Sequence, residues 1–274
     1  MKKIIVGIIC LILLVVLGLS MTVVIVDNRT ANIVIIAGQS NAEGTPLYKD
    51  TIQELGGDRY AQFLTGVDNV KYISRIYKDK FLNYKFGLNE YNQSFGLEVG
   101  IVDYWLNTRP TKNLYIVKSC VGGSGLKDYW LKDNNGFSGY TELCGVVDTA
   151  ISQLKSQHRK INILGMCWLQ GESDAGMLQE ENSKEYGKNI EILIDKLREK
   201  YGDFKFIDAE ISHIEKAPYY TNVNLGKVEF AGKSSNNIFM PTFDLGLTFQ
   251  DDMLHYDAVT QIKVGRRFGG YLFN

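Results

Sequence analysis

Four short apolar runs recur along the chain, at residues 32–37, 113–118, 161–168 and 205–211. The first run reads Asn-Ile-Val-Ile-Ile-Ala, and β-branched residues dominate it. Runs of this length and composition predict strands of a parallel sheet that is buried on both faces.

Segments with helical spacing of apolar residues lie between and after these runs. They cover residues 97–106, 141–157 and 183–201, and Asp257 is placed to cap a final helix that ends near Tyr271. Strands that alternate with helices predict an α/β domain in which helices cover both faces of a parallel sheet. In such domains ligands bind at the carboxyl ends of the strands.

Two stretches have weak periodicity. Residues 50–92 are rich in tyrosine and lysine, and residues 218–237 are similarly irregular. We expect both to be long loops that decorate the binding face.

The N-terminal segment has a different pattern. Lys2 and Lys3 precede residues 4–26, which carry no charge and are long enough to span a bilayer core of roughly 30 Å. We expect residues 1–27 to be a membrane anchor, or a signal segment if the small residues at 18–20 are cleaved. Residues 28–274 then form one exported domain, either anchored outside the cytoplasm or secreted.

Charge and cysteine content exclude several classes of protein. The 30 basic and 31 acidic residues give a net charge of −1, so no basic excess is present to bind nucleic acid. Beyond the N-terminal segment the cysteines are Cys120, Cys144 and Cys167, an odd number without a CxxC pair. This pattern indicates neither a disulfide scaffold nor a zinc site, and we expect Cys120 and Cys167 to be buried free thiols.

Candidate chemistry follows the first three predicted strands. Ser40 lies in a Gly-Gln-Ser-Asn turn at 38–41, where it is equally well interpreted as a nucleophile or as a helix cap. Glycines at 122–123 permit close backbone approach to an oxyanion, although an ordinary tight turn explains them as well. Residues 168–174 place an amide and two carboxylates at a strand end.

Histidine is the usual general base at neutral pH, and the chain has three. His158 lies at a basic helix end, where we expect it to be solvated. His213 follows the fourth strand and is interpreted as a loop or substrate contact. His255 lies three residues after Asp252, a spacing that lets the carboxylate orient the imidazole. Two solvated residues at a helix entry would give the same spacing.

Together these blocks resemble the SGNH (GDSL-like) hydrolase superfamily, and more narrowly its sialate O-acetylesterase and carbohydrate esterase family 6 branch. The resemblance rests on 38–41 (Gly-Gln-Ser-Asn), 122–124 (Gly-Gly-Ser), 170–174 (Gln-Gly-Glu-Ser-Asp) and Asp252-x-x-His255, in this order. Residues 94–98 also resemble the branch's Phe-Gly-Pro-Glu segment, with leucine in place of proline.

The resemblance implies a three-layer α/β/α sandwich with a parallel, flavodoxin-like sheet. It implies an acyl-enzyme mechanism without metal or cofactor, in which Ser40 attacks an ester and His255 moves the proton. The oxyanion hole would consist of the N–H groups of Ser40 and Gly122 and the side chain of Gln170.

Other site residues follow from the same resemblance. Asp252 is the favoured partner of the histidine, and Glu172 is the alternative. The residues expected to contact substrate are Gln39, Asn41, Gly123 and Trp168. Glu98 and Asp174 are expected to support loops.

The leading hypothesis is therefore an exported serine esterase that removes O-acetyl groups from carbohydrate, either sialic acid or an acetylated polysaccharide. A glycan O-acyltransferase or a lipid-type esterase of the same fold is an alternative. A third possibility is a catalytically inactive surface protein that binds carbohydrate through some of its 16 tyrosines.

Overall fold

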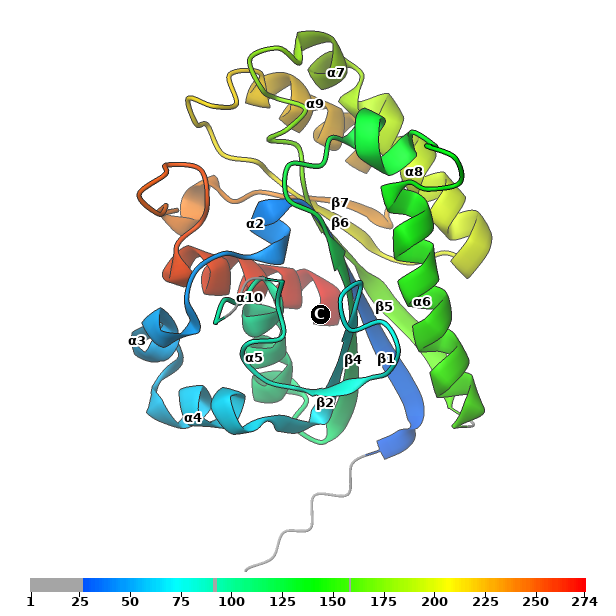
Figure 1. Ribbon diagram of the computed structural model, residues 1–274, viewed down its shortest axis with the longest axis vertical. Helices are drawn as coiled ribbons and strands as arrows, with labels where there is room; N and C mark the ends of the chain where they lie inside the picture. The colour runs from blue at the N-terminus through cyan, green and yellow to red at the C-terminus, as the bar shows by residue number, and fades with distance from the viewer. Residues whose placement is uncertain (1–26, 91–92, 158) are drawn as a thin grey trace, which may run out of the picture.

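The computed structural model describes residues 27–90, 93–157 and 159–274. In this part of the chain a seven-stranded sheet lies between two layers of helices (Figure 1). The order across the sheet is β3-β2-β4-β1-β5-β6-β7. The strands are β1 (Asp27–Gly38), β2 (Val67–Ser74), β3 (Leu82–Tyr84), β4 (Lys112–Cys120), β5 (Lys160–Leu169), β6 (Phe206–Ala209) and β7 (Asn237–Met240).

The centre of the sheet is the most deeply buried part of the domain. β1 runs parallel to β4 on one side and to β5 on the other, with Ile35 opposite Val117 and Met166. Residues 33–37 are at most 2% exposed, because helices cover both faces of this strand. β3 pairs antiparallel with β2 at one edge. The predicted α/β class and the mostly parallel sheet are confirmed.

Helices α5 and α10 cover one face of the sheet, and α6 and α8 cover the other (Figure 1). The helices are α2 (Ser40–Glu43), α3 (Ile52–Leu55), α4 (Gly57–Thr65), α5 (Glu98–Thr108), α6 (Gly139–Ser156), α7 (Glu180–Lys184), α8 (Tyr186–Tyr201), α9 (Tyr220–Ala231) and α10 (Ala258–Phe273). α5 and α10 touch through glycines: a Cβ on Gly100 would lie 2.2 Å from the carbonyl oxygen of Ile262. This approach holds the final helix against the sheet.

The predicted cap of the final helix is confirmed, whereas the continuous helix over 183–201 is wrong. The Asp257 side chain accepts a hydrogen bond of 2.9 Å from the N–H of Thr260 at the start of α10. The 183–201 segment is divided into α7 and α8, which meet at Glu185.

The two stretches predicted to be loops contain regular structure. Residues 50–92 include α3, α4, β2 and β3, and residues 218–237 include α9. α9 buries Val223 and Phe230, but it also buries Lys227. A lysine among the buried positions interrupts the apolar pattern from which a helix would be predicted. The periodicity was weak because tertiary contacts, rather than an amphipathic pattern, select this helix.

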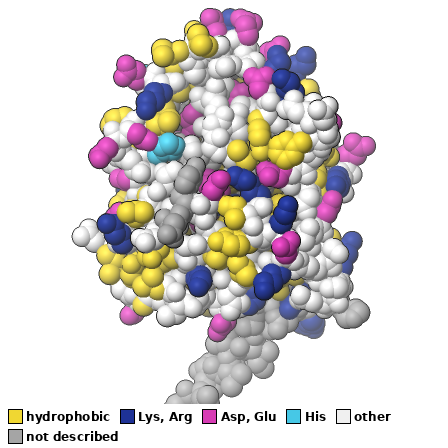
Figure 2. All heavy atoms as spheres, viewed as in Figure 1, with side chains coloured by type: hydrophobic (Ala, Val, Ile, Leu, Met, Phe, Trp, Pro, Cys, Tyr) yellow, Lys and Arg dark blue, Asp and Glu magenta, His cyan; other side chains and the backbone are white. Residues whose placement is uncertain are grey.

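The predicted anchor over residues 1–27 lies outside the described residues, except for Asp27, which begins β1. Within the described ranges, no helix is both long and apolar enough to cross a membrane. Cys120 and Cys167 are buried and free, as predicted. Acidic and basic side chains are interspersed over the face drawn in Figure 2, as the near balance of charge suggests.

Candidate active site

The turn from β1 into α2 places Ser40 at the carboxyl edge of the sheet. Gly38 has a φ of +144°, and a Cβ there would lie 2.1 Å from the carbonyl oxygen of Leu169. The N–H of Gln39 donates to that same oxygen over 3.0 Å. Glycine is therefore required at residue 38, because only without a side chain can the chain approach β5 and turn at once into α2.

Ser40 is the first residue of α2 and is 8% exposed. The N-cap is Gln39, so Ser40 is not the capping residue. In the described part of the chain the Ser40 hydroxyl makes no hydrogen bond, and the first N–H groups of a helix lack an intrahelical partner. The residue thus presents both a hydroxyl and a backbone donor at the strand end.

A single carboxylate organises the loop that carries His255. Asp252 Oδ2 lies 2.5 Å from His255 Nδ1, and Asp252 Oδ1 accepts hydrogen bonds of 2.9 Å from the N–H groups of Leu254 and His255. Met253, between them, has a φ of +52°, which a non-glycine residue rarely adopts. The carboxylate stabilises this tight turn and orients the imidazole.

The charge of Asp252 is secure at neutral pH. Partial burial raises its pKa, but the backbone N–H groups of His255 and Leu254 and the imidazole outweigh that effect and lower the pKa to about 2. In a neutral imidazole, an ionised carboxylate beside Nδ1 keeps the ring proton on Nδ1. Nε2 is then unprotonated and can accept a second proton.

Asn41 holds the helix of Ser40 against the loop of His255. Its Nδ2 donates to the carbonyl oxygen of Leu254 over 3.3 Å, and its Oδ1 accepts from the N–H of Tyr256 over 3.0 Å. Both bonds flank His255 directly. Among the described residues no hydrogen bond joins the Ser40 hydroxyl to the His255 ring, and such contacts are often long before substrate binds.

Glu172, the alternative partner of the histidine, contacts Asn41 instead. It is 6% exposed, and its Oε1 accepts a hydrogen bond of 2.7 Å from Asn41 Nδ2. Its Oε2 is buried and has no hydrogen-bond partner in the described ranges. Of the two acids left open by the sequence, the geometry places Asp252 against the imidazole and Glu172 behind Asn41.

Gln170, the expected oxyanion-hole donor, makes hydrogen bonds within the protein. Its side chain is fully buried, and its Nε2 donates to the carbonyl oxygen of Ser124 over 2.9 Å and to Asp174 Oδ2 over 2.5 Å. Both hydrogens of the amide are used inside the protein. Gln170 therefore supports the loop in this structure, and its part in an oxyanion hole stays a prediction.

The side chains of Gln39 and Trp168 are also buried. Gln39 Oε1 accepts 3.2 Å hydrogen bonds from the N–H groups of Gly171 and Ser173. Trp168 Nε1 donates to the Tyr186 hydroxyl over 3.0 Å, and the Trp168 side chain is 0% exposed. Each side chain thus fastens one strand-end turn to another, and the expected substrate contacts at both residues stay predictions.

Gly122 and Gly123 form an exposed turn after β4, next to the Ser40 turn. The N–H of Val121 donates to the carbonyl oxygen of Gly38 over 3.0 Å and joins the two turns. Gly123 has a φ of +68° and open space at its Cβ position. In the described chain the N–H of Gly122 has no hydrogen-bond partner, so it is available to an oxyanion.

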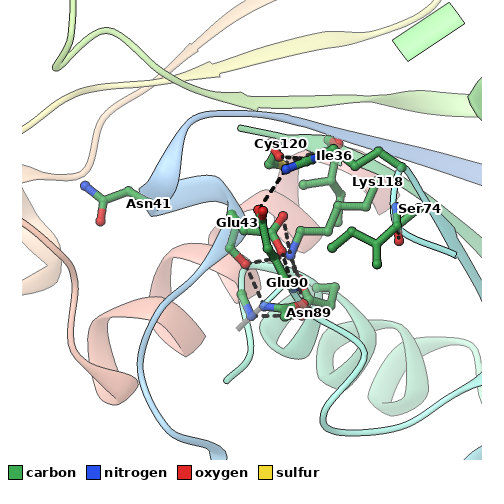
Figure 3. A network of polar contacts seen from close by, with 12 residues as sticks. Ile36, Asn41, Glu43, Ser74, Asn89, Glu90, Lys118 and Cys120 are labelled. Atoms are coloured by element: carbon green, nitrogen blue, oxygen red, sulfur yellow. Dashed lines mark hydrogen bonds and ion pairs between the residues drawn. The ribbon is translucent and has the colours of Figure 1, made fainter. Parts of the chain in front are cut away.

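The sequence analysis missed a buried cluster behind α2. Lys118 Nζ lies 2.6 Å from the carbonyl oxygen of Glu43, 2.9 Å from Glu98 Oε2 and 3.1 Å from Asn89 Oδ1. Figure 3 shows that Glu43 points into this cluster whereas Asn41, on the same helix, points away from it. A lysine within the apolar run 113–118 was the signal, because such a buried charge needs carboxylate partners.

Burial and pairing shift the pKa values of this cluster. Burial raises the pKa of Glu43, and Lys118 opposes that effect only in part. Burial lowers the pKa of Lys118, but Glu43 and Glu98 outweigh it and raise the pKa above its ordinary value. Glu98 also accepts the N–H of Gly96 over 2.8 Å, which fits the loop-supporting role expected of it.

Asp174 supports the loop after β5. Its two oxygens accept from the N–H of Leu126 at 3.0 Å, and Oδ2 also accepts from Gln170. Burial raises the pKa of Asp174 to about 6, against the opposing effect of these hydrogen bonds. The residue has the role that the sequence suggested, away from the Ser40 hydroxyl.

The fold is similar to that of several solved structures. A protein of Arabidopsis thaliana superposes with a TM-score of 0.68 at 18% identity, over 88% of this chain and 97% of that one. The protein NanS gives 0.60 at 14% identity, over 89% and 97%. XAC1771, described as a novel carbohydrate acetylesterase from Xanthomonas citri, gives 0.57 at 14% identity, over 87% of this chain and 55% of that one.

Comparison of the sequence with curated proteins finds no match. Residues 30–273, nearly all of the described chain, match the family described as "Carbohydrate esterase, sialic acid-specific acetylesterase". The resemblance drawn from the residues around Ser40 and His255 is thereby confirmed. The chain belongs to this family of carbohydrate acetylesterases.

Proposed function

We propose that the protein is a serine esterase that removes O-acetyl groups from carbohydrate, either sialic acid or an acetylated polysaccharide, through an acyl-enzyme intermediate. The observation that carries this proposal is the pair of hydrogen bonds from Asn41 to the residues on either side of His255. They hold the neighbour of Ser40 against a histidine whose Nδ1 already contacts Asp252.

In the first half of the reaction, Ser40 Oγ attacks the acetyl carbonyl carbon and its proton passes to His255 Nε2. The Asp252 carboxylate stabilises the imidazolium that forms. The N–H groups of Ser40 and Gly122 donate to the oxyanion, and a donor of this kind contributes roughly 3 kcal/mol to lowering the barrier. The imidazolium then gives its proton to the sugar oxygen, which leaves as the alcohol.

In the second half, His255 takes a proton from water, and the resulting hydroxide attacks the acetyl-serine carbonyl. The same two N–H groups stabilise the second oxyanion. Acetate leaves, and the proton returns to Ser40. The chain's own residues supply every proton transfer.

The test is the effect of Ser40→Ala on acetate release from an aryl acetate, from acetylated xylan and from O-acetyl sialic acid. By analogy with other serine triads, kcat falls by up to roughly 10⁶-fold. Ser156→Ala is the matched control, since Ser156 is exposed at the end of α6. A serine-reactive phosphonate labels the unsubstituted protein and the control but not Ser40→Ala.

Undiminished turnover by a correctly folded Ser40→Ala variant would exclude the mechanism. Folding is checked independently by the unfolding temperature. If the phosphonate labels Ser40 but none of the acetylated sugars is hydrolysed, Ser40 is still a reactive nucleophile. The proposal that the substrate is an acetylated carbohydrate is then wrong.

We further propose that residues 1–27 direct export and either remain as a membrane anchor or are cleaved. The uncharged run at 4–26 behind two lysines supports this. In cells, an added protease that cannot cross the membrane should digest the domain. Full protection of the domain in intact cells would contradict export.

A further inference from the structure

A cavity of about 450 Å³ opens beside the His255 loop, at the carboxyl ends of β6 and β7. Its volume lies within the range of small-molecule sites. Glu210, Ser212 and His213 follow β6 and line it, and Thr242 and Phe243 line it from the segment after β7. The cavity therefore lies at the same edge of the sheet as Ser40, the edge where ligands bind in parallel α/β domains.

The cavity is joined to the candidate catalytic loop through Tyr256. Phe249 lines the cavity and pairs with Tyr256, their ring centroids 5.6 Å apart. The Tyr256 hydroxyl lies 3.2 Å from Ser212 Oγ, and the N–H of Tyr256 is bound to Asn41. Phe249 and Ser212 in the cavity wall thus contact Tyr256, the residue that follows His255.

Aromatic rings form the walls. The His213 and Tyr220 rings are stacked, with centroids 4.7 Å apart and planes at 23°. Phe243 is 77% exposed, although a phenylalanine gains free energy from burial. Flat, exposed rings of this kind offer apolar faces to the C–H face of a sugar ring, while neighbouring hydroxyls can bind its edge.

The polar lining carries a negative charge. Glu210 Oε2 accepts the N–H groups of Thr242 and Phe243 over 2.8 and 3.1 Å, which holds the carboxylate at the rim. Among the described residues that line the cavity, Glu210 is the one carboxylic acid, and none is lysine or arginine. A sugar that bears its own carboxylate would be repelled there, whereas the hydroxyls of a neutral sugar can donate to Glu210.

We propose that this cavity is a subsite for a neutral sugar unit of the acetylated substrate, stacked against Phe243 and the His213–Tyr220 pair. The inference rests on the proposed function and narrows it in one respect: the sugar next to the acetylated one is uncharged. The subsite positions the sugar that is linked to the acetylated one, so that the ester reaches Ser40.

Direct binding tests the subsite without relying on turnover. Xylotriose, cellotriose and maltotriose are titrated into the full-length protein by calorimetry, with N-acetylneuraminic acid as the charged comparison. At least one neutral trisaccharide binds, and Phe243→Ala weakens it by roughly tenfold, as loss of one stacked ring would. Phe137→Ala is the matched control, because Phe137 is also exposed, at 48%, but lies before α6, outside the cavity lining.

Glu210→Gln tests the choice of a neutral sugar. The amide keeps an acceptor for the two N–H groups but loses the charge. We expect the affinity for N-acetylneuraminic acid relative to the neutral trisaccharide to rise in this variant. Equal affinities for the charged and neutral sugars in both proteins would overturn that choice.

Two further results would overturn the subsite itself: no binding of any of the three neutral trisaccharides, or equal binding by Phe243→Ala and the unsubstituted protein. Because Phe243 is mostly exposed, unfolding does not explain a loss of binding, and the unfolding temperature checks this. Failure of the proposed esterase is seen separately, as unchanged acetate release by Ser40→Ala.

Discussion

Acidic and basic side chains lie together on each side of α2, but they are exposed on one side and buried on the other. On the side of Asn41, the pair Asp252–His255 lies in a loop, with side chains 42% and 23% exposed. On the side of Glu43, Lys118 and its carboxylate partners are at most 4% exposed (Figure 3). Each side joins an acidic group to a basic one by hydrogen bonds.

The difference in burial decides what each pair can do. The imidazole of His255 is open to a ligand and can change its protonation during a reaction, because solvent and substrate reach it. Lys118 is enclosed by acceptors that hold its proton, so it can only position the helix. We therefore propose that the exposed Asp252–His255 pair serves the reaction and that the buried Lys118 cluster makes α2 rigid, and four predictions test this division.

The largest effect is expected on the exposed side. Asp252→Asn should lower kcat/KM for an aryl acetate by roughly 10³–10⁴-fold, because the imidazolium loses its carboxylate and Nδ1 loses its fixed tautomer. Asp251→Asn, an exposed acid one residue earlier, is the control and should retain activity. A loss in Glu172→Gln as large as expected here, with Asp252→Asn fully active, would reverse the assignment of the acid.

On the buried side, Lys118→Met should lower the free energy of unfolding by about 3–5 kcal/mol, because two buried carboxylates lose their cation. Urea denaturation measures the change. Lys184→Met is the control, since Lys184 pairs with Glu180 and Glu181 at the surface. Loss of these exposed pairs should change the free energy of unfolding little. A Lys118→Met variant as stable as the control would show that the cluster does not hold α2 in place.

The third prediction concerns the buried carboxyl of Asp174 and the change of stability with pH. Its pKa is raised to about 6 by burial, so the folded state binds its proton more tightly than the unfolded state does. The stability that this group contributes is complete below about pH 4 and is lost as the pH rises through 6. Relative to the unsubstituted protein, the free energy of unfolding of Asp174→Asn should therefore rise by about 2 kcal/mol between pH 4 and 7.

Urea denaturation at several pH values measures that gain, with the exposed Asp58→Asn as control. A difference between Asp174→Asn and the unsubstituted protein that stays constant from pH 4 to 7 would mean that the buried carboxyl does not titrate in this range.

The smallest effect on catalysis is expected at Trp168. Trp168→Phe removes the hydrogen bond to the Tyr186 hydroxyl and leaves a cavity where the larger indole ring was, so it should lower the free energy of unfolding by about 2–4 kcal/mol. KM for acetylated oligosaccharides should not rise, because the side chain is buried. A raised KM without loss of stability would restore Trp168 as a substrate contact.

Much of the fold could be predicted because short apolar runs in the sequence mark its central strands. The run at 33–37 is apolar throughout, and a strand buried on both faces requires that. The edge strands β3 and β7, the strand β2 and the helix α9 escaped prediction, and in α9 the buried face includes the charged residue Lys227. Asp208, 2.6 Å from the Lys227 Nζ, and the carbonyl oxygens of Gln170 and Ala209 make burial of that lysine possible.

The candidate site also has one part that the sequence predicts and another that only the structure shows. The relation between Asp252 and His255 is local, three residues apart, and the sequence favoured this contact, with Glu172 as the alternative. The roles of Gln170 and Gln39 depend on which backbone groups of distant segments meet them, and both side chains are turned inward. No spacing along the chain distinguishes an amide that faces a ligand from one that binds a neighbouring loop.

By itself, then, the sequence determined the strand end that carries Ser40, the spacing of Asp252 and His255, and the family to which the chain belongs. Only the tertiary structure decided which acid meets the histidine, which polar side chains are buried, and that a cavity with aromatic walls opens beside the loop. The physical reason is that burial and hydrogen-bond partnership depend on segments more than a hundred residues apart, such as Asn41 and Tyr256.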